Sequence, residues 1–246
     1  MMKYKPLFFL LVFLNISCGI SEDCFKGNGS RVTNTYLFDN FTKVKAHNGI
    51  ALVIKQGPVY EVKVETSSTI STELDFQLKE NMLIIKDHST CNMARDYGQT
   101  TVYIMTPNLE EIHSKTEQDI KSDGVLNYPL LRLFSIGDDG DGAGTGNFYL
   151  DIEADQLVVE SNTISNFYLN GTCQEMLLNI YFGDGRFYGE DLKAQQIHVF
   201  HRGSNDVIVY PIQKIEGTIV STGNVVLKNV PPITNVSQVF TGKLMY

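Results

Sequence analysis

The feature that most limits how this chain can fold is a repeat of about 20 residues in its second half. In each repeat an apolar residue is followed ten positions later by a second one. The first members of successive pairs are 20, 20 and 18 residues apart. A period in this range is typical of solenoids, in which each repeat forms one turn of a coil. The pairs are Leu157 and Phe167, Leu177 and Phe187, Ile197 and Val207, and Ile215 and Val225.

A short segment rich in Gly, Ser, Asn and Asp precedes the second member of each pair, at 163–166, 183–186, 203–206 and 221–224. Such residues turn the chain at low cost, so these segments predict corners. One turn cannot bury its own apolar side, whereas stacked turns bury a continuous column. We expect that column to contain Leu133, Phe148, Leu150, Leu157, Val159, Phe167, Leu169, Leu178, Ile180, Phe187, Ile197, Val199, Val207, Val209, Ile215, Ile219, Val225 and Leu227.

The first third of the chain shows the two-residue alternation of half-buried strands, with Ile50, Leu52 and Ile54 facing one way. No long helical period is present. The sequence therefore predicts an all-β fold, a β-helix-like solenoid of parallel strands with rungs of about 20 residues, capped by an N-terminal β region.

The expected organisation is one domain over 36–246, divided into an N-terminal β cap region (36–105) and a repeat ladder (106–246). Open coils leave edge strands that can pair with other chains. The last residues, Val239 to Tyr246, are therefore expected to add a final strand or to contact a neighbouring copy, which would make the protein a homo-oligomer.

Composition excludes one class of partner. The net charge is −8 and the isoelectric point is about 5.1, whereas a protein that binds nucleic acid needs a basic face to displace phosphate counterions. We therefore expect no nucleic-acid partner.

The N-terminus has the pattern of an export signal. A short basic segment and the apolar run Leu7 to Leu14 predict a signal peptide over residues 1–17. Cys18 follows Ser17 and is similar to the lipidated cysteine of bacterial lipoproteins, although Leu14 lies one position earlier than that pattern requires. We expect a lipidated tether over 18–35 that anchors the chain to a membrane. The alternative is an ordinary signal peptide with an incidental Cys18.

Three further cysteines follow Cys18. In an exported chain Cys24, just before the first strand, and Cys91, in a polar loop, can form a disulfide that ties the tether to the N-terminal sheet. The alternative is two free thiols. Cys173 has no Cys or His at ligand spacing and is expected to be a buried filler.

The chain resembles a family of exported, β-rich Bacteroidetes proteins, the putative auto-transporter adhesins with a head GIN domain. The segments that carry the resemblance, over about 36–245, are Phe41 to Lys45, Asn48 to Gly57, Val62 to Glu65 and Val102 to Ile112, with the later corners. Ala51 replaces the Asn of the motif that names the family. The resemblance implies a right-handed β-helix-like fold and supports export.

The strongest candidate for a metal site is the glycine-rich segment 137–147, which contains Asp138, Asp139 and Asp141. Calcium prefers six to eight oxygen ligands on a flexible loop. The spacing does not match an EF-hand, however, so we expect an enlarged corner and no cofactor. His198 and His201 are three positions apart in an expected strand and should point to opposite faces, which argues against zinc.

The expected function is that of an exported outer-membrane lipoprotein, on the cell surface or the periplasmic face, that acts as a binding or structural module and not as an enzyme. Its partner would be a protein or a glycan. Candidate contacts are outward-facing tyrosines that lie beside the ladder residues, although these could equally be ordinary strand residues: Tyr149, Tyr168, Tyr181 and Tyr188. The alternative is a carbohydrate-active enzyme, a polysaccharide lyase or hydrolase, which would need converging carboxylates.

Overall fold

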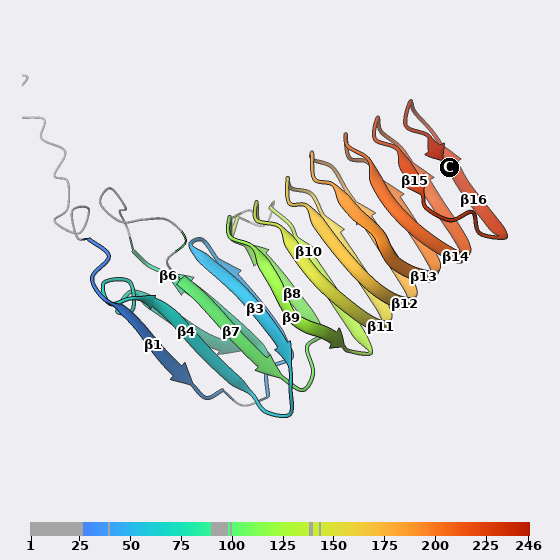
Figure 1. Ribbon diagram of the computed structural model, residues 1–246. Coiled ribbons are helices and arrows are strands. Elements are labelled where there is room, and N and C mark those ends of the chain that lie inside the picture. The colour runs from blue at the N-terminus through green and yellow to red at the C-terminus, as the bar shows by residue number, and fades with distance from the viewer. Residues whose placement is uncertain (1–26, 39, 90–97, 99, 138–139, 143) are drawn as a thin grey trace, which may run out of the picture.

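The computed structural model describes residues 27–38, 40–89, 98, 100–137, 140–142 and 144–246. This part of the chain is all-β and contains no helix, and so none that could cross a membrane (Figure 1). Its strands are β1 (Arg31–Tyr36), β2 (Lys43–His47), β3 (Ile50–Gln56), β4 (Glu61–Ser67), β5 (Leu74–Lys79), β6 (Met82–Asp87), β7 (Thr100–Thr106), β8 (Glu111–Lys115), β9 (Ile120–Asn127), β10 (Leu130–Ser135), β11 (Phe148–Ser161), β12 (Phe167–Ile180), β13 (Phe187–His201), β14 (Val207–Ile219), β15 (Val225–Leu227), β16 (Ile233–Gln238) and β17 (Leu244–Met245).

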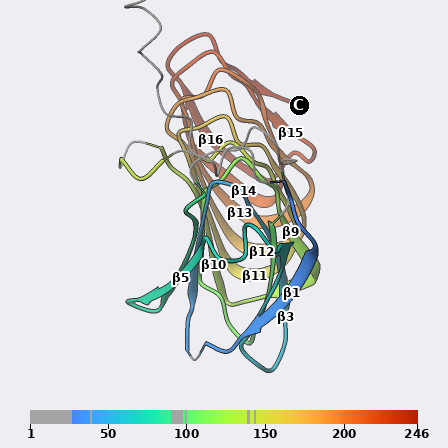
Figure 2. The same cartoon turned by 90° about the vertical axis from the view of Figure 1, so that its left-hand side faces the viewer.

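The strands form one continuous sheet that curls so that two arms face each other (Figure 2). The first arm contains β1, β4, β7, β3 and β9, then the N-terminal halves of β11 to β14, then β15 and β17. The second arm contains β5, β6, β2, β8 and β10, then the C-terminal halves of β11 to β14, then β16. The four long strands therefore pass through both arms.

Neighbouring strands are parallel except at the N-terminal end, where β1–β4, β4–β7 and β5–β6 are antiparallel. Parallel pairing is not confined to the expected ladder, because β2 and β3 pair in parallel with strands on both sides. The N-terminal region thus contributes its own parallel layers. Strand β1 also belongs to the sheet, although all of it except Tyr36 lies in the range 18–35 that was predicted to be a tether.

The repeat is less regular than a uniform rung of 20 residues. Among the four long strands β11 to β14, the separation between paired residues ranges from 17, for Lys193 beside Tyr210, to 21, for Asn170 beside Asp191. Register shifts at these positions absorb the difference. One shorter step displaces an expected residue: Leu157 pairs with Met176, so Leu177 takes a half-buried outer position instead. Segments 163–166, 183–186, 203–206 and 221–224 do form the corners between long strands.

The predicted core is confirmed. All eighteen residues expected to point inward are buried, and the most exposed of them, Leu227, is only 4% exposed. Three phenylalanines follow one another along the column between the arms, the first two stacked and the third tilted against the second. The ring of Phe167 lies 4.7 Å from that of Phe148 and 6.4 Å from that of Phe187. Because successive side chains of a strand point to opposite faces, these rings face the core while the residues next to them in each strand face outward.

An aromatic cluster packs against the N-terminal end of this core. Tyr36 on β1 and Phe76 on β5 come from the outermost strands of the two arms, and their ring centroids are 4.8 Å apart. Phe38 lies 6.1 Å from Phe76. The cluster thus joins the edges of the two arms at this end.

Cys173 lies in the core with 2% of its surface exposed, and burial raises the pKa of its thiol to about 12. A thiol with so high a pKa is a poor nucleophile. The expected filler role therefore fits its position. Cys18, Cys24 and Cys91 lie outside the described residues.

Candidate binding surface

One row of side chains crosses the outer surface of the first arm from strand to strand. The register places Lys63 beside Tyr103, Tyr103 beside Val53, and Val53 beside Lys121. Because side chains alternate between the two faces of a strand and their neighbours are buried, these residues point outward. The row continues from Lys121 through Tyr149, Tyr168 and Tyr188.

The three tyrosines of this row form a continuous stack. The ring centroids of Tyr149 and Tyr168 are 4.7 Å apart at an interplanar angle of 3°, and those of Tyr168 and Tyr188 are 4.6 Å apart at 8°. The ammonium group of Lys121 lies over the Tyr149 ring, 5.4 Å from its centroid. Burial and the adjoining phenols raise the pKa of Tyr168. Because the rings cover one another, they present edges and hydroxyl groups to solvent rather than faces on which a sugar could stack.

Tyr181 does not join the other three expected tyrosines. It follows the second-arm half of β12, and its hydroxyl group donates a hydrogen bond of 2.9 Å to Oε1 of Glu160. Burial, with this hydrogen bond, raises the pKa of Tyr181. The structure therefore splits the candidate tyrosines between the two arms.

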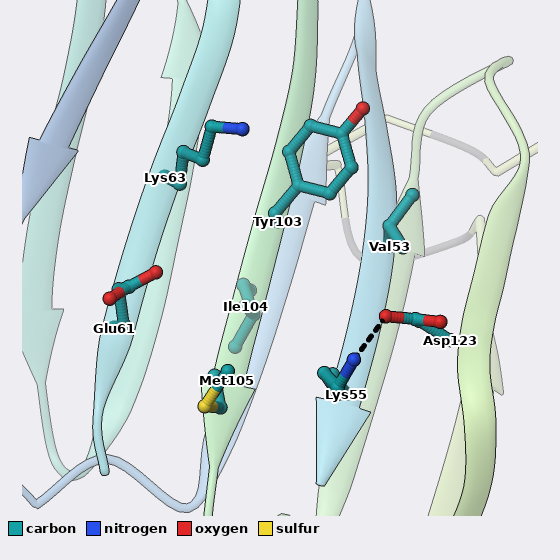
Figure 3. A pocket seen from close by; sticks show the side chains of 8 residues that line it. All are labelled: Val53, Lys55, Glu61, Lys63, Tyr103, Ile104, Met105 and Asp123. Atoms are coloured by element: carbon teal, nitrogen blue, oxygen red, sulfur yellow. Dashed lines mark hydrogen bonds and ion pairs between the residues drawn. The ribbon is translucent and has the colours of Figure 1, made fainter. Parts of the chain in front are cut away.

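A shallow groove lies over β3, where the outer row passes from large side chains to small ones. It consists of two depressions of about 150 and 290 Å³ that share Val53. The side chains of Ala51 and Val53 are short, whereas those of Lys63, Tyr103 and Lys121 on the strands to either side are long. The surface over β3 is therefore hollowed. Figure 3 shows the smaller depression, with Tyr103 and Lys63 on one side of β3 and Asp123 on the other, where it pairs with Lys55 of β3 itself. We call these two depressions the β3 groove.

Paired charges of both signs surround the β3 groove. Nζ of Lys55 lies 2.7 Å from Oδ2 of Asp123, and Nζ of Lys63 lies 2.7 Å from Oε1 of Glu65. The hydrogen bond between Lys63 and Glu65 raises the pKa of the lysine and lowers that of the carboxyl. The Lys63 ammonium group also lies 5.1 Å from the Tyr103 ring centroid. The groove thus offers one aromatic side chain with hydrogen-bonding groups of both kinds.

Ala51 lines the larger depression. Its side chain is on the outer face of β3, between the buried Ile50 and Leu52. The position at which this chain departs from the head GIN motif therefore lies at the candidate binding surface and not at a turn.

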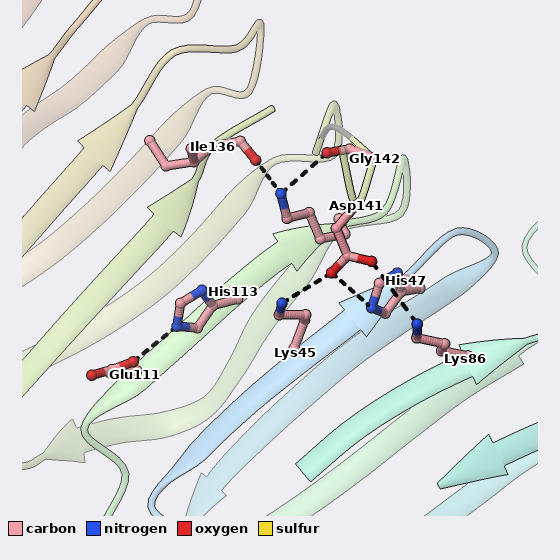
Figure 4. Close-up of polar contacts among 9 residues, drawn as sticks. Lys45, His47, Lys86, Glu111, His113, Ile136, Asp141 and Gly142 are labelled. Carbon is pink, nitrogen blue, oxygen red and sulfur yellow. Dashed lines mark hydrogen bonds and ion pairs between the residues drawn. The ribbon is translucent and has the colours of Figure 1, made fainter. Parts of the chain in front are cut away.

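Of the three candidate aspartates in segment 137–147, the structure describes Asp141. Asp138 and Asp139 lie outside the described residues. The Oδ2 atom of Asp141 is 3.0 Å from Nζ of Lys45 and 3.7 Å from Nε2 of His47 (Figure 4). Burial opposes ionisation, but the Lys45 hydrogen bond and neighbouring positive charges lower the pKa of Asp141 overall. A carboxylate with cationic neighbours is poorly suited to a metal ion. The described residues contain no group of three potential metal ligands.

A second ion network lies next to it on the outer surface of the second arm. The Glu111 carboxylate is 2.9 Å from Nε2 of His113, 3.1 Å from Nζ of Lys43 and 3.5 Å from Nη1 of Arg132. Burial opposes ionisation of Glu111, yet these partners lower its pKa overall. Burial lowers the pKa of His113, whose ring stacks on Phe134 at 4.4 Å. A carboxyl held ionised in this way is a poor general acid for cleaving a glycosidic bond.

His198 and His201 point to opposite faces, as their spacing predicts. Nδ1 of His198 is 2.9 Å from Oε1 of Glu216 on the outer surface of the second arm, whereas His201 is fully buried. Burial lowers the pKa of His201. The two imidazoles therefore cannot share a metal ion.

The fold and surface define an all-β chain with a groove on the outside of a curled sheet. The family described as putative auto-transporter adhesin, head GIN domain matches residues 40–231, and the chain belongs to this family. No curated protein matches the sequence.

Several solved structures share the fold. A putative adhesin from Bacteroides fragilis has a TM-score of 0.79 and 18% identity, covering 89% of this chain and 99% of its own. A putative adhesin from Parabacteroides distasonis has a TM-score of 0.65 and 14% identity, covering 89% and 98%. A putative lipid binding protein from the same organism has a TM-score of 0.62 and 15% identity, covering 90% and 100%. At these identities the likeness establishes the fold alone.

The sequence interpretation missed the residues of the β3 groove. Tyr103 and Lys63 alternate with buried residues in their strands, and Lys121 follows the buried Ile120, which marks all three as outward-facing. Their convergence requires β3 to lie between β7 and β9, a pairing across long sequence separations. The sequence feature that could have indicated the groove is Ala51, because it departs from the family motif at an outward-facing position of a strand.

Proposed function

We propose that the chain is an envelope-anchored lipoprotein that acts as an adhesin-type binding module, with the β3 groove as its contact surface. The observation that carries the proposal is the groove itself, in which Tyr103 and paired charges of both signs surround short side chains. The groove is shallow and bordered by groups that donate and groups that accept hydrogen bonds, which suits a glycan, because sugar hydroxyl groups both donate and accept hydrogen bonds. Membership of a family described as putative adhesins supports a binding role.

The finer features of the proposal rest on the sequence. Residues 1–17 are a signal peptide, lipidated Cys18 anchors the tether, and a Cys24–Cys91 disulfide fastens that tether to the N-terminal sheet. Parallel pairing from β8 to β17 supports a β-helix-like solenoid, and the resemblance to the family implies that it is right-handed. The proposed binding role involves no catalysis.

Protease treatment of intact cells tests the location. If the module is displayed on the cell surface, an antibody to the region after β14 should lose its signal in intact cells while a periplasmic control protein stays whole. Protection until the cells are permeabilised would place the module in the periplasm and contradict the adhesin role.

Substitution of Ala51 tests the groove. Ala51→Lys should reduce binding to a glycan identified on an array by about tenfold or more, because the long side chain fills the larger depression. The matched control is Thr172→Lys, which adds the same charge at an exposed site on the same arm, outside the groove. Binding is measured by titration of the purified chain. Equal effects of the two substitutions would contradict the proposed glycan site. Binding of the chain to proteins but to no glycan on the array would contradict it as well.

A further inference from the structure

The two ends of the sheet are finished differently. At the N-terminal end the antiparallel strands β1 and β5 form the edges of the two arms, and Tyr36, Phe38 and Phe76 pack against the core between them. At the other end the edge of the second arm is β16, which pairs with β14 on one side (Figure 1). Within the described residues, no strand pairs with the outer side of β16.

The core is thinly covered at the β16 end. Thr234 and Val236 lie beside Ile215 and Gly217 and so face inward, but only Val236 and Leu244 there are apolar residues packed against the core. Several apolar side chains at this end of the sheet, over both arms, are instead exposed to solvent: Val230, Ile233, Val239, Phe240, Met245 and Tyr246.

The same edge is free of charge. No Asp, Glu, Lys, Arg or His occurs in residues 229–242, although the chain as a whole carries a net charge of −8. Proteins commonly protect an exposed edge strand with charged residues, lysine above all. The N-terminal edges follow that rule, since β1 carries Arg31 and β5 carries Asp75 and Lys79. The β16 edge does not, and two copies of this acidic chain can approach there without like charges meeting.

We propose that the β16 edge is a self-association surface, at which β16 of a second copy pairs antiparallel with β16 across a two-fold axis. Two identical edges related by such an axis always run antiparallel, so each supplies the backbone groups that the other lacks. The inward-facing residues of both copies stay on the inner face only if the two-fold axis passes through a residue of β16 and not between two residues. The residues at the middle of β16 are Asn235 and Val236. Asn235 of one copy then lies opposite Asn235 or Ser237 of the other.

A head-to-tail arrangement suits the two ends less well. It would bring the uncharged β16 edge against β1 or β5, whose charges would lose water without gaining partners. It would also leave a free edge at every step and produce open filaments rather than a closed dimer. The difference between the two ends therefore favours the two-fold pair.

Sedimentation velocity of the full chain in mild detergent tests the proposal, from about 1 to about 100 µM, a range in which micromolar complexes dissociate measurably. The protein mass should rise from that of one chain to that of two chains as the concentration increases. Asn235→Lys should weaken dimerisation by about tenfold or more, because the new charges lie close together across the axis. The matched control is Thr33→Lys on the exposed N-terminal edge strand β1, which should leave the dimer intact.

A mixing experiment separates the two arrangements. Asn235→Lys and Asn235→Glu should each dimerise more weakly alone, by about tenfold or more, and the mixture should regain dimerisation, because opposite charges then meet at the axis. A head-to-tail contact would show no such rescue, since position 235 would face the other end of the neighbouring copy. A monomer at every concentration, a dimer that Asn235→Lys leaves unchanged, or a mass that grows beyond two copies would each overturn the proposal.

Discussion

Replacing Gly217 with alanine is expected to lower the free energy of unfolding by about 3 kcal/mol or more. Gly217 in β14 has a φ of +138°, which residues with a Cβ atom rarely adopt, and an added Cβ would lie 1.9 Å from the backbone oxygen of Val199 in β13. The methyl group therefore strains its own backbone and forces two paired strands apart. Thermal unfolding should shift downward by about 6 °C or more for a chain of this size.

Gly124→Ala is the matched control for backbone strain alone. Gly124 also has a positive φ, of +88°, but a Cβ added there would meet nothing within 4 Å. Its expected cost is about 1–2 kcal/mol. The two variants are compared by thermal and denaturant unfolding, and similar losses from both would show that close approach of β13 and β14 is not what requires glycine at 217.

Phe167→Ala is expected to lower the free energy of unfolding by about 3–5 kcal/mol. Phe167 is 1% exposed and lies between Phe148, on which its ring stacks, and Phe187, against which it is tilted. Removing the ring leaves a cavity between the arms and removes both aromatic contacts. Denaturant unfolding of the purified chain measures the loss.

The adjacent residue supplies the comparison. Tyr168 is the middle member of a stack on the outer surface, so Tyr168→Ala should cost about 1–3 kcal/mol, the value of two aromatic contacts without a buried cavity. A loss as large as that of Phe167→Ala would mean that the outer stack supports the sheet as strongly as the core does.

The sequence predicts those parts of the fold that depend on local patterning. The eighteen inward residues are buried and the four polar segments form corners, because alternation and turn chemistry act within a few residues. Unequal repeats were harder to foresee. The shift that places Met176 rather than Leu177 beside Leu157 arises from pairing between strands, and two adjacent apolar residues give no local sign of which one faces inward.

The candidate surface was predicted only in part. Outward placement of Tyr149, Tyr168 and Tyr188 follows from alternation, but their mutual stacking depends on register between three strands. Because that stacking occupies the ring faces, the candidate contact surface lies instead at Tyr103 and Ala51. The sequence did not predict that these two residues lie close together. Their proximity comes from β3 lying between β7 and β9, which no local pattern encodes.

The long strands β11 to β14 are not part of the β3 groove, which lies on β4, β7, β3 and β9 together with the loop before β9. In a stacked sheet each layer touches mainly its immediate neighbours. A relative could therefore gain or lose one of these long layers and change its reach without disturbing the groove. Length and recognition are separate variables in this architecture, and selection can act on one while leaving the other as it was.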